Sequence, residues 1–158
     1  MAEDKTNVMR LLDQAKIPYT PRQYDVSDGR LDGLTAAARL GVPAEQCFKT
    51  LVTVGASKRN YVFVVPVTRE LDLKAAARAV GEKSIDMIPQ AKLLPLTGYI
   101  HGGCSPVGMK KKLPTVIDAD AQTLEQMTVS AGKVGRQVSL SPQDLAAYVD
   151  ATFAPVSK

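Results

Sequence analysis

The residues best suited to chemistry lie in one glycine-rich stretch, between positions 98 and 112. Gly102, Gly103 and Gly108 leave backbone N–H groups open to close approach by a ligand. Pro106 stiffens the turn by fixing its own φ angle, and lysines follow at once at positions 110–112. Exposed amides and nearby cations suit a polar or negatively charged ligand. The stretch therefore predicts a binding loop, and a tight β-hairpin with a basic, solvated rim is the alternative interpretation.

The loop does not match a nucleotide-binding P-loop. Gly103 and Gly108 have the glycine spacing of that motif, but Met109 stands where its lysine belongs. The residues that follow, at 113–118, predict a strand, whereas a P-loop must open a helix. The sequence therefore argues against this class of phosphate site.

Length and composition predict one globular domain. The chain has 158 residues, 45% of them hydrophobic, which is enough to bury a core, and its net charge of +4 permits a polyanionic partner. It contains no run of about 18 apolar residues and no apolar signal core, so we expect no membrane association and a cytoplasmic location. Cys47 and Cys104 form no Cys-x-x-Cys pair, which favours a reducing compartment, and we expect neither a metal nor another cofactor.

Hydrophobic periodicity predicts a domain with mixed α and β structure. Helices are expected at 7–17, 34–40, 72–80, 89–94 and 142–149, with Ser141 as the N-cap of the last one. Strands are expected at 19–26, 48–54, 61–67, 98–101, 115–117, 127–130 and 137–140. The strands at 48–54 and 61–67 are rich in β-branched residues, so we place them at the centre of a sheet.

Lys49 is an unusual residue near the start of an apolar strand. Alternation along the strand places its side chain on the opposite face from Phe48 and Thr50. It is interpreted either as a cation that points into a polar pocket or as a surface lysine at a solvated strand end.

Two further side chains could take part in a reaction. Cys104 could act as a nucleophile if a base made its thiolate, but His101 lies too close in sequence for the usual spatially assembled pair. Ser130, at the end of a strand and shortly before Gly132, could present its hydroxyl to a cleft or lie in a simple hairpin turn.

The order and spacing of these residues give the chain a specific resemblance to the YbaK/EbsC family, the free-standing bacterial deacylases related to the editing insertion of prolyl-tRNA synthetase. The resemblance rests on segments spread over nearly the whole chain: the helix expected at 7–17, the strand around Tyr24, FKTL at 48–51, LDLK at 71–74, TGYI at 97–100, GGCSP at 102–106, KK at 110–111, LPTVID at 113–118 and VSAGK at 129–133. Each segment is short, and their common order and spacing make the match specific.

The resemblance implies a single editing domain over residues 1–158. It implies an α/β (α+β) fold, in which a mixed, strongly curved, barrel-like sheet of about six to seven strands is flanked by helices. The implied activity is that of a trans-editing hydrolase that removes mischarged cysteine from tRNA(Pro), with the substrate thiol as nucleophile. The implied partners are the acceptor end of aminoacyl-tRNA and prolyl-tRNA synthetase, with no DNA and no membrane.

Residue roles follow from the same resemblance. Lys49 matches the family's essential lysine and is the expected catalytic residue. The expected substrate-binding residues are Tyr24, Gly102, Gly103, Cys104, Ser105, Pro106, Gly108, Ser130 and Gly132. The tRNA is expected to contact Lys110, Lys111, Lys112 and Lys133.

Three alternatives stay open at the level of the sequence. Cys104 stands where many relatives carry Ile, and Val134 and Gln137 replace residues that are often charged, so the amino acid removed could be alanine, with water as the nucleophile. The same loop and lysine could instead hold an aminoacyl or nucleotide ligand without turnover. The third alternative is a hydrolase that uses the Cys104 thiol itself. The sequence leaves the preference among cysteine, alanine and serine open.

Overall fold

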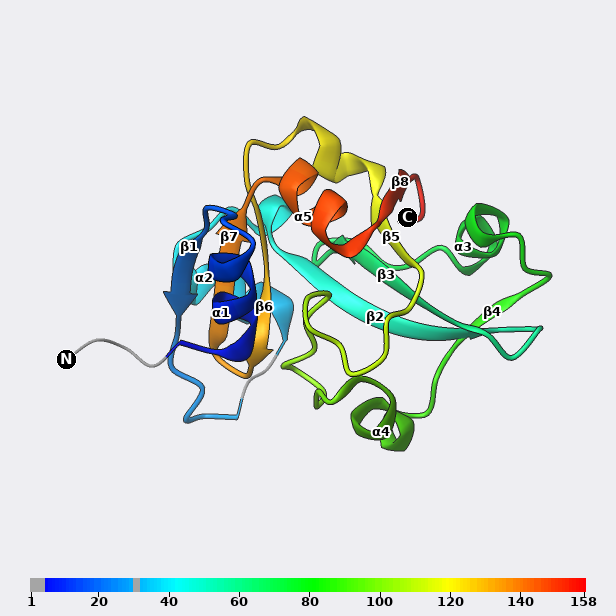
Figure 1. Cartoon of the computed structure of the whole chain (residues 1–158), viewed down its shortest axis with the longest axis horizontal. Coiled ribbons are helices and arrows are strands. Elements are labelled where there is room, and N and C mark those ends of the chain that lie inside the picture. The colour runs from blue at the N-terminus through cyan, green and yellow to red at the C-terminus, as the bar shows by residue number, and fades with distance from the viewer. Residues whose placement is uncertain (1–4, 30–31) are drawn as a thin grey trace.

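The computed structural model describes residues 5–29 and 32–158, which form five α-helices and eight strands in two sheets (Figure 1). The larger sheet has the order β4-β2-β3-β5-β8 and contains β2 (Phe48–Gly55), β3 (Asn60–Pro66), β4 (Ile85–Met87), β5 (Thr115–Asp118) and β8 (Thr152–Ala154). β2 pairs antiparallel with β3 and β4, whereas β5 pairs parallel with β3 and β8. The sheet is therefore mixed, as the sequence predicted.

The smaller sheet is antiparallel and lies at the opposite end of the molecule from β4 (Figure 1). It has the order β1-β7-β6 and contains β1 (Thr20–Gln23), β6 (Met127–Lys133) and β7 (Arg136–Leu140). An isolated parallel bridge between Cys47 and Thr128 joins it to the larger sheet. Within the described residues no further strand pairing links β2 to β6, so the two strands separate just after this bridge.

The central strand β3 is buried on both faces, because different elements pack against each of them. Val62 and Val64 face a core cluster that also includes side chains of α1 (Asn7–Gln14), β6 and β7. Phe63 and Val65 point the other way, into a second cluster with α3 (Leu73–Val80). The first cluster spans both sheets, and it therefore fixes the position of the small sheet relative to β2 and β3.

Side chains at the helix starts make the caps that the sequence favours. Ser141 caps α5 (Pro142–Val149), as predicted, and its Oγ accepts a hydrogen bond from the N–H of Asp144. The other N-caps with side-chain hydrogen bonds are Thr6 for α1, Asp32 for α2 (Gly33–Leu40) and Asp72 for α3. The short α4 (Leu93–Thr97) directly follows a 3-10 turn at Gln90–Lys92, and further 3-10 turns lie at Ala44–Gln46 and Ala119–Thr123.

The fold class is confirmed, but two expectations about the strands need correction. The expected single curved sheet of about six to seven strands is instead two sheets, with β4 and β8 at the edges of the larger one. Each of these edge strands has three residues, too few to show the period-two pattern of a strand. The predicted strand at 98–101 is wrong, because Gly98 ends α4 with a φ of 83° and Tyr99 then packs against the core.

Within the described parts of the chain, no helix is long and apolar enough to span a bilayer.

Candidate active site

A cavity of about 420 Å³ lies where β2 and β6 separate. Its walls come from the start of β2, the first turn of α2, the loop that follows Tyr99, and the facing strands of the small sheet. A cavity of this size, with mostly apolar walls and a few polar groups, is typical of a small-molecule site.

Five residues that were selected from the sequence line this cavity: Tyr24, Lys49, Gly102, Cys104 and Ser130. The other five members of the expected substrate-binding set are not part of its lining: Gly103, Ser105, Pro106, Gly108 and Gly132. Three of these, at 103, 105 and 106, are buried. The structure therefore brings Lys49, Tyr24 and Ser130 together with two residues of the loop, Gly102 and Cys104. The rest of the predicted loop residues do not line the cavity.

The loop is held in place from within. The hydroxyl of Tyr99 donates to the carbonyl of Val107 at 2.5 Å, and the N–H of Gly103 donates to the carbonyl of Ile100 at 3.0 Å. Gly103 also lies against the β6–β7 turn, where an added Cβ would stand 3.2 Å from the backbone nitrogen of Val134. The amide of Gly103 is thus committed to the loop, and any amide donor to a ligand must come from its neighbours.

Lys49 brings positive charge to the cavity. Of the lining residues that the structure describes, it is the only Lys or Arg, and Asp32 is the only carboxylate. The Lys49 side chain is half-buried, and it forms no salt bridge with any residue in 5–29 or 32–158. Its ammonium group can therefore pair with an anionic or carbonyl group of a ligand.

Both cysteines of the chain also line the cavity. Burial raises the pKa of the Cys104 thiol to about 12, although a hydrogen bond with Thr97 opposes this shift. Burial likewise raises the pKa of Cys47 to about 11. Both groups therefore remain protonated thiols near neutral pH. Because the nucleophilic form of cysteine is the thiolate, neither residue is prepared to act as a nucleophile.

Tyr24 extends the edge of the small sheet. Its N–H donates to the carbonyl of Gly135 at 3.0 Å, which continues the pairing of β1 beside β7. Burial raises the pKa of its phenol, and a side-chain hydrogen bond with Gln137 acts against that rise. Gln137 is itself a lining residue, so these two polar side chains form one wall of the cavity.

Ser130 lies at a bulge of β6, where the register with β7 shifts. Its Oγ accepts a hydrogen bond from the N–H of Gly132 at 3.1 Å. This bond uses the oxygen as an acceptor, so the hydroxyl proton can still be donated to a ligand.

The site residues expected from the sequence omit four polar residues of the cavity: Asp32, Thr50, His101 and Gln137. The only local signal for Asp32 was its suitability as the cap of α2, which says nothing of a cavity. The Oγ1 atom of Thr50 is buried and has no hydrogen-bond partner in the described part of the chain. No periodicity or motif could have identified this atom, because its burial depends on how the two sheets meet.

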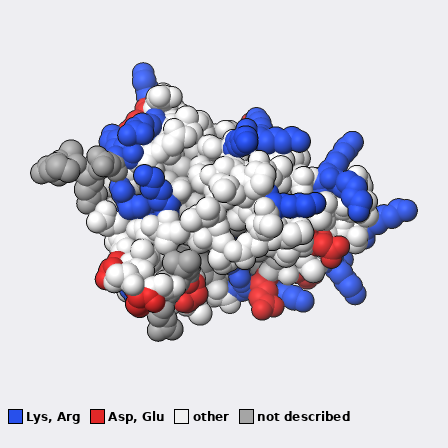
Figure 2. All heavy atoms as spheres, turned by 90° about the horizontal axis from the view of Figure 1, so that it is seen from below, with Lys and Arg blue, Asp and Glu red and all other residues white. Residues whose placement is uncertain are grey.

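The lysines expected to meet tRNA lie outside the cavity. Lys110, Lys111 and Lys133 are exposed, whereas Lys112 forms an exposed salt bridge with Asp150. Figure 2 shows that Lys and Arg side chains surround a largely uncharged centre on one face, while Asp and Glu gather along its lower edge. Among the described residues, the basic side chains on this face lie in separate groups and form no continuous patch. They can still attract a polyanion over a distance.

Comparison with known proteins places this site in a family. The sequence model of the aminoacyl-tRNA editing domain matches residues 34–148, which include all of α2 except its first residue, together with β2, the glycine-rich loop and Ser130. The chain belongs to this family. The family expected from the sequence is confirmed, and with it the expected class of activity, that of a trans-editing aminoacyl-tRNA deacylase.

Individual relatives agree with this assignment. A protein of Enterococcus faecalis, provisionally named Cys-tRNA(Pro)/Cys-tRNA(Cys) deacylase EbsC, is 41% identical over 155 residues, covering 98% of this chain and 94% of the relative. A crystal structure described provisionally as a trans-editing enzyme for prolyl-tRNA synthetase has a TM-score of 0.81 and 26% identity, over 96% of this chain and 94% of the other. The hypothetical protein APE2540 has the same fold, with a TM-score of 0.86 at 22% identity over 96% of this chain and 99% of its own.

Proposed function

We propose that this editing domain, taken as one unit over the whole chain, hydrolyses cysteine from mischarged tRNA(Pro). The observation that carries the proposal is the convergence of Lys49, Tyr24 and Ser130 with the loop residues Gly102 and Cys104 on one cavity. The E. faecalis relative, whose name gives cysteinyl-tRNA as its substrate, supports cysteine as the amino acid removed.

The walls of the cavity are consistent with a small side chain. Ala36, Cys47 and Val67 contribute small or apolar surfaces, so a thiol side chain would lie among groups of similar polarity. Binding of this kind separates a small amino acid from a large one by exclusion, but it separates cysteine from alanine or serine only weakly. We therefore attribute the selection of cysteine to chemistry and not to fit.

The proposed nucleophile is the thiol of the substrate. Its sulfur attacks the carbonyl carbon of the aminoacyl ester, the bond from that carbon to the ribose oxygen breaks, and the thiol proton passes to the ribose oxygen. The products are tRNA with a free terminal hydroxyl and a cyclic thioester, which water opens to cysteine. The protein has to hold the ester bent, with sulfur and carbonyl carbon about 3–3.5 Å apart.

Lys49 and the loop supply the electrostatic part of this mechanism. The Lys49 ammonium contacts the terminal phosphate or the ester oxygen through a charge-assisted hydrogen bond. Loop N–H groups other than that of Gly103 stabilise the negative charge that develops on the carbonyl oxygen. Cys104 takes no covalent part, because burial keeps its thiol protonated with a pKa of about 12.

The remaining parts of the proposal concern partners and location. The acceptor end of the tRNA enters the cavity, and its phosphates meet Lys110, Lys111 and Lys133, with Lys112 joining when its pair with Asp150 opens. Prolyl-tRNA synthetase is the proposed protein partner, which would deliver the mischarged tRNA in the cytoplasm.

A deacylation panel tests this function. Rates are measured on cysteinyl-, seryl-, alanyl- and prolyl-tRNA(Pro), and mass spectrometry follows the released product. Cysteinyl-tRNA should react fastest and release a cyclic thioester or cysteine, and seryl-tRNA should lag by orders of magnitude because its hydroxyl is a weak nucleophile. Equal rates on alanyl- and cysteinyl-tRNA would replace the mechanism by one that uses water. Tight binding of the aminoacyl-tRNAs without deacylation would show that the protein is a binding module and not an enzyme.

A further inference from the structure

Asp32 brings a carboxylate to the same cavity that contains Lys49. The two residues come from different elements, since Asp32 is the N-cap of α2 and Lys49 lies on β2. Among the lining residues that the structure describes, these are the one carboxylate and the one Lys or Arg, so a ligand that carries an amine at one end and oxygens at the other has a favoured orientation.

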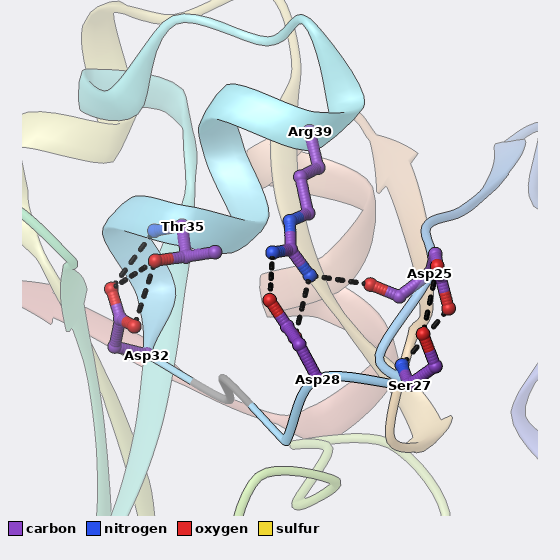
Figure 3. A network of polar contacts seen from close by, with 6 residues as sticks. All are labelled: Asp25, Ser27, Asp28, Asp32, Thr35 and Arg39. Carbon is purple, nitrogen blue, oxygen red and sulfur yellow. Dashed lines mark hydrogen bonds and ion pairs between the residues drawn. The ribbon is translucent and has the colours of Figure 1, made fainter.

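The Asp32 carboxylate is held in a defined position. Its Oδ2 accepts from the N–H of Thr35 at 2.9 Å, and its Oδ1 accepts from the Thr35 hydroxyl at 2.8 Å (Figure 3). The next residue, Gly33, lies directly against Val67, because an added Cβ would stand 2.3 Å from the Cγ1 atom of that residue. The first turn of α2 is therefore packed closely against Val67, which also lines the cavity.

A second set of contacts ties α2 to the segment that follows Tyr24. Arg39, in the last turn of α2, donates to the backbone carbonyl of Asp25 at 2.6 Å and forms an ion pair with Asp28 at 2.5 Å (Figure 3). Ser27 closes this segment locally by donating its N–H to the carboxylate of Asp25 at 2.9 Å. The walls that carry Tyr24 and Asp32 are therefore joined to each other, which preorganises the cavity before a ligand enters.

We propose that Asp32 binds the α-amino group of the aminoacyl ester, which makes it a specificity-determining residue for a free amino acid. The inference rests on the proposed function, because it assigns the amino end of that substrate. An aminoacyl ester offers an amine as hydrogen-bond donor at one end and ester and phosphate oxygens at the other. The carboxylate of Asp32 accepts from the amine, and Lys49 takes the oxygen end.

This arrangement has a consequence for the choice of substrate. An N-blocked ester, such as a peptidyl- or formylaminoacyl-tRNA, carries an amide in place of the amine and can no longer donate a charge-assisted hydrogen bond to Asp32. The blocked nitrogen also brings an extra acyl group toward α2. The enzyme should therefore spare tRNAs that carry blocked amino acids, which include growing chains.

The test compares cysteinyl-tRNA with N-acetylcysteinyl-tRNA in three proteins. These are the unmodified chain, Asp32→Asn, and the control Glu45→Gln, which removes one exposed carboxylate from the 3-10 turn after α2, outside the cavity. Asn is as good an N-cap as Asp, so Asp32→Asn keeps the start of α2 while it removes the charge and one of the two oxygens that accept from Thr35. Circular dichroism and thermal unfolding confirm that each variant is folded.

The unmodified protein should prefer the free amine in kcat/KM by about 10- to 100-fold, as expected for one hydrogen bond to a charged group. Asp32→Asn should lose most of this preference through a lower kcat/KM on cysteinyl-tRNA, with little change on the N-acetyl ester. Glu45→Gln should retain the preference. The proposal is overturned if the unmodified protein does not distinguish the two esters, or if Asp32→Asn lowers both rates equally, since the carboxylate would then act only as a helix cap.

A binding measurement separates this inference from the proposed function. The probe is 3′-cysteinylamino-3′-deoxyadenosine, an amide analogue that cannot be hydrolysed, together with its N-acetyl form. If the protein binds the free-amine probe more tightly than the N-acetyl probe, and Asp32→Asn abolishes this preference, the assignment of Asp32 is supported. If the same protein deacylates no tRNA, the proposed deacylase function is refuted. Rapid deacylation, with no Asp32-dependent preference in binding or rate, would support the deacylase function and refute the assignment of Asp32.

Discussion

Cys47 and Thr128 form the parallel bridge that joins the two sheets, and it is at this bridge that the cavity begins. Two residues further along each strand stand Lys49 and Ser130, which both line the cavity and come from different sheets. The bridge thus sets the distance between the residue expected to supply charge and a residue expected to contact the substrate.

Lys49→Ala should lower kcat/KM for cysteinyl-tRNA by about a hundredfold or more, because it removes the only lysine or arginine from the described lining of the cavity. Single-turnover deacylation measures this loss, and thermal unfolding shows whether the fold is intact. The matched control is Lys74→Ala, which removes an exposed lysine of α3 and should leave the rate unchanged. A folded Lys49→Ala protein with an unmodified rate would refute the role of this lysine.

Cys104→Ala should keep most of the deacylase activity, because a thiol whose pKa is about 12 holds its proton at neutral pH. Iodoacetamide should accordingly alkylate Cys104 slowly near pH 7 and faster as the pH rises, which peptide mass spectrometry can follow. A loss of activity as large as that of Lys49→Ala would place the nucleophile in the protein and favour the thiol hydrolase.

The free energy of unfolding should fall at alkaline pH. The folded pKa of Cys104 is raised from 9.0 to about 12 and that of Cys47 to about 11, in both cases chiefly by burial. A raised thiol pKa means that the folded state binds protons that the unfolded state has released, so stability is complete below about pH 9 and decreases up to about pH 11–12. Denaturant unfolding at several pH values should show this slope.

The double variant Cys47→Ala, Cys104→Ala tests the cause of that slope. It removes both buried thiols, so its stability should depend less on pH in the same window, whatever the two substitutions cost in packing. An unchanged slope would assign the pH dependence to other groups, such as Tyr99, whose pKa burial also raises to about 12.

Replacing Lys110, Lys111 and Lys112 together by Ala should weaken binding to all tRNAs alike and reduce the slope of log affinity against log salt by about two to three. The exposed pair of Lys112 with Asp150 should cost little stability when it is lost. The charge-matched control replaces Lys74, Arg78 and Lys83, which are exposed in or just after α3. Equal effects in both triple variants would mean that net charge matters and that the tract makes no specific contact.

Local sequence determined a large part of this structure. The central hairpin of β2 and β3 follows from two runs of β-branched residues, and α5 begins where Ser141 and Pro142 predict. The family resemblance could also be read from short segments, because their residues keep a fixed order along the chain. That order predicts Tyr24, Lys49, Gly102, Cys104 and Ser130 as site residues, and all five line one cavity.

Only the tertiary structure decided how these residues meet. Residues Cys47 and Thr128 are far apart in the chain, and no local periodicity encodes that they pair, or that β5 joins β3 in parallel. The same reason explains the errors at 98–101, where an apparently strand-like segment became a loop because Tyr99 bonds to Val107. It also explains why Asp32, locally no more than a helix cap, was recognised as a cavity residue only once α2 was packed against Val67.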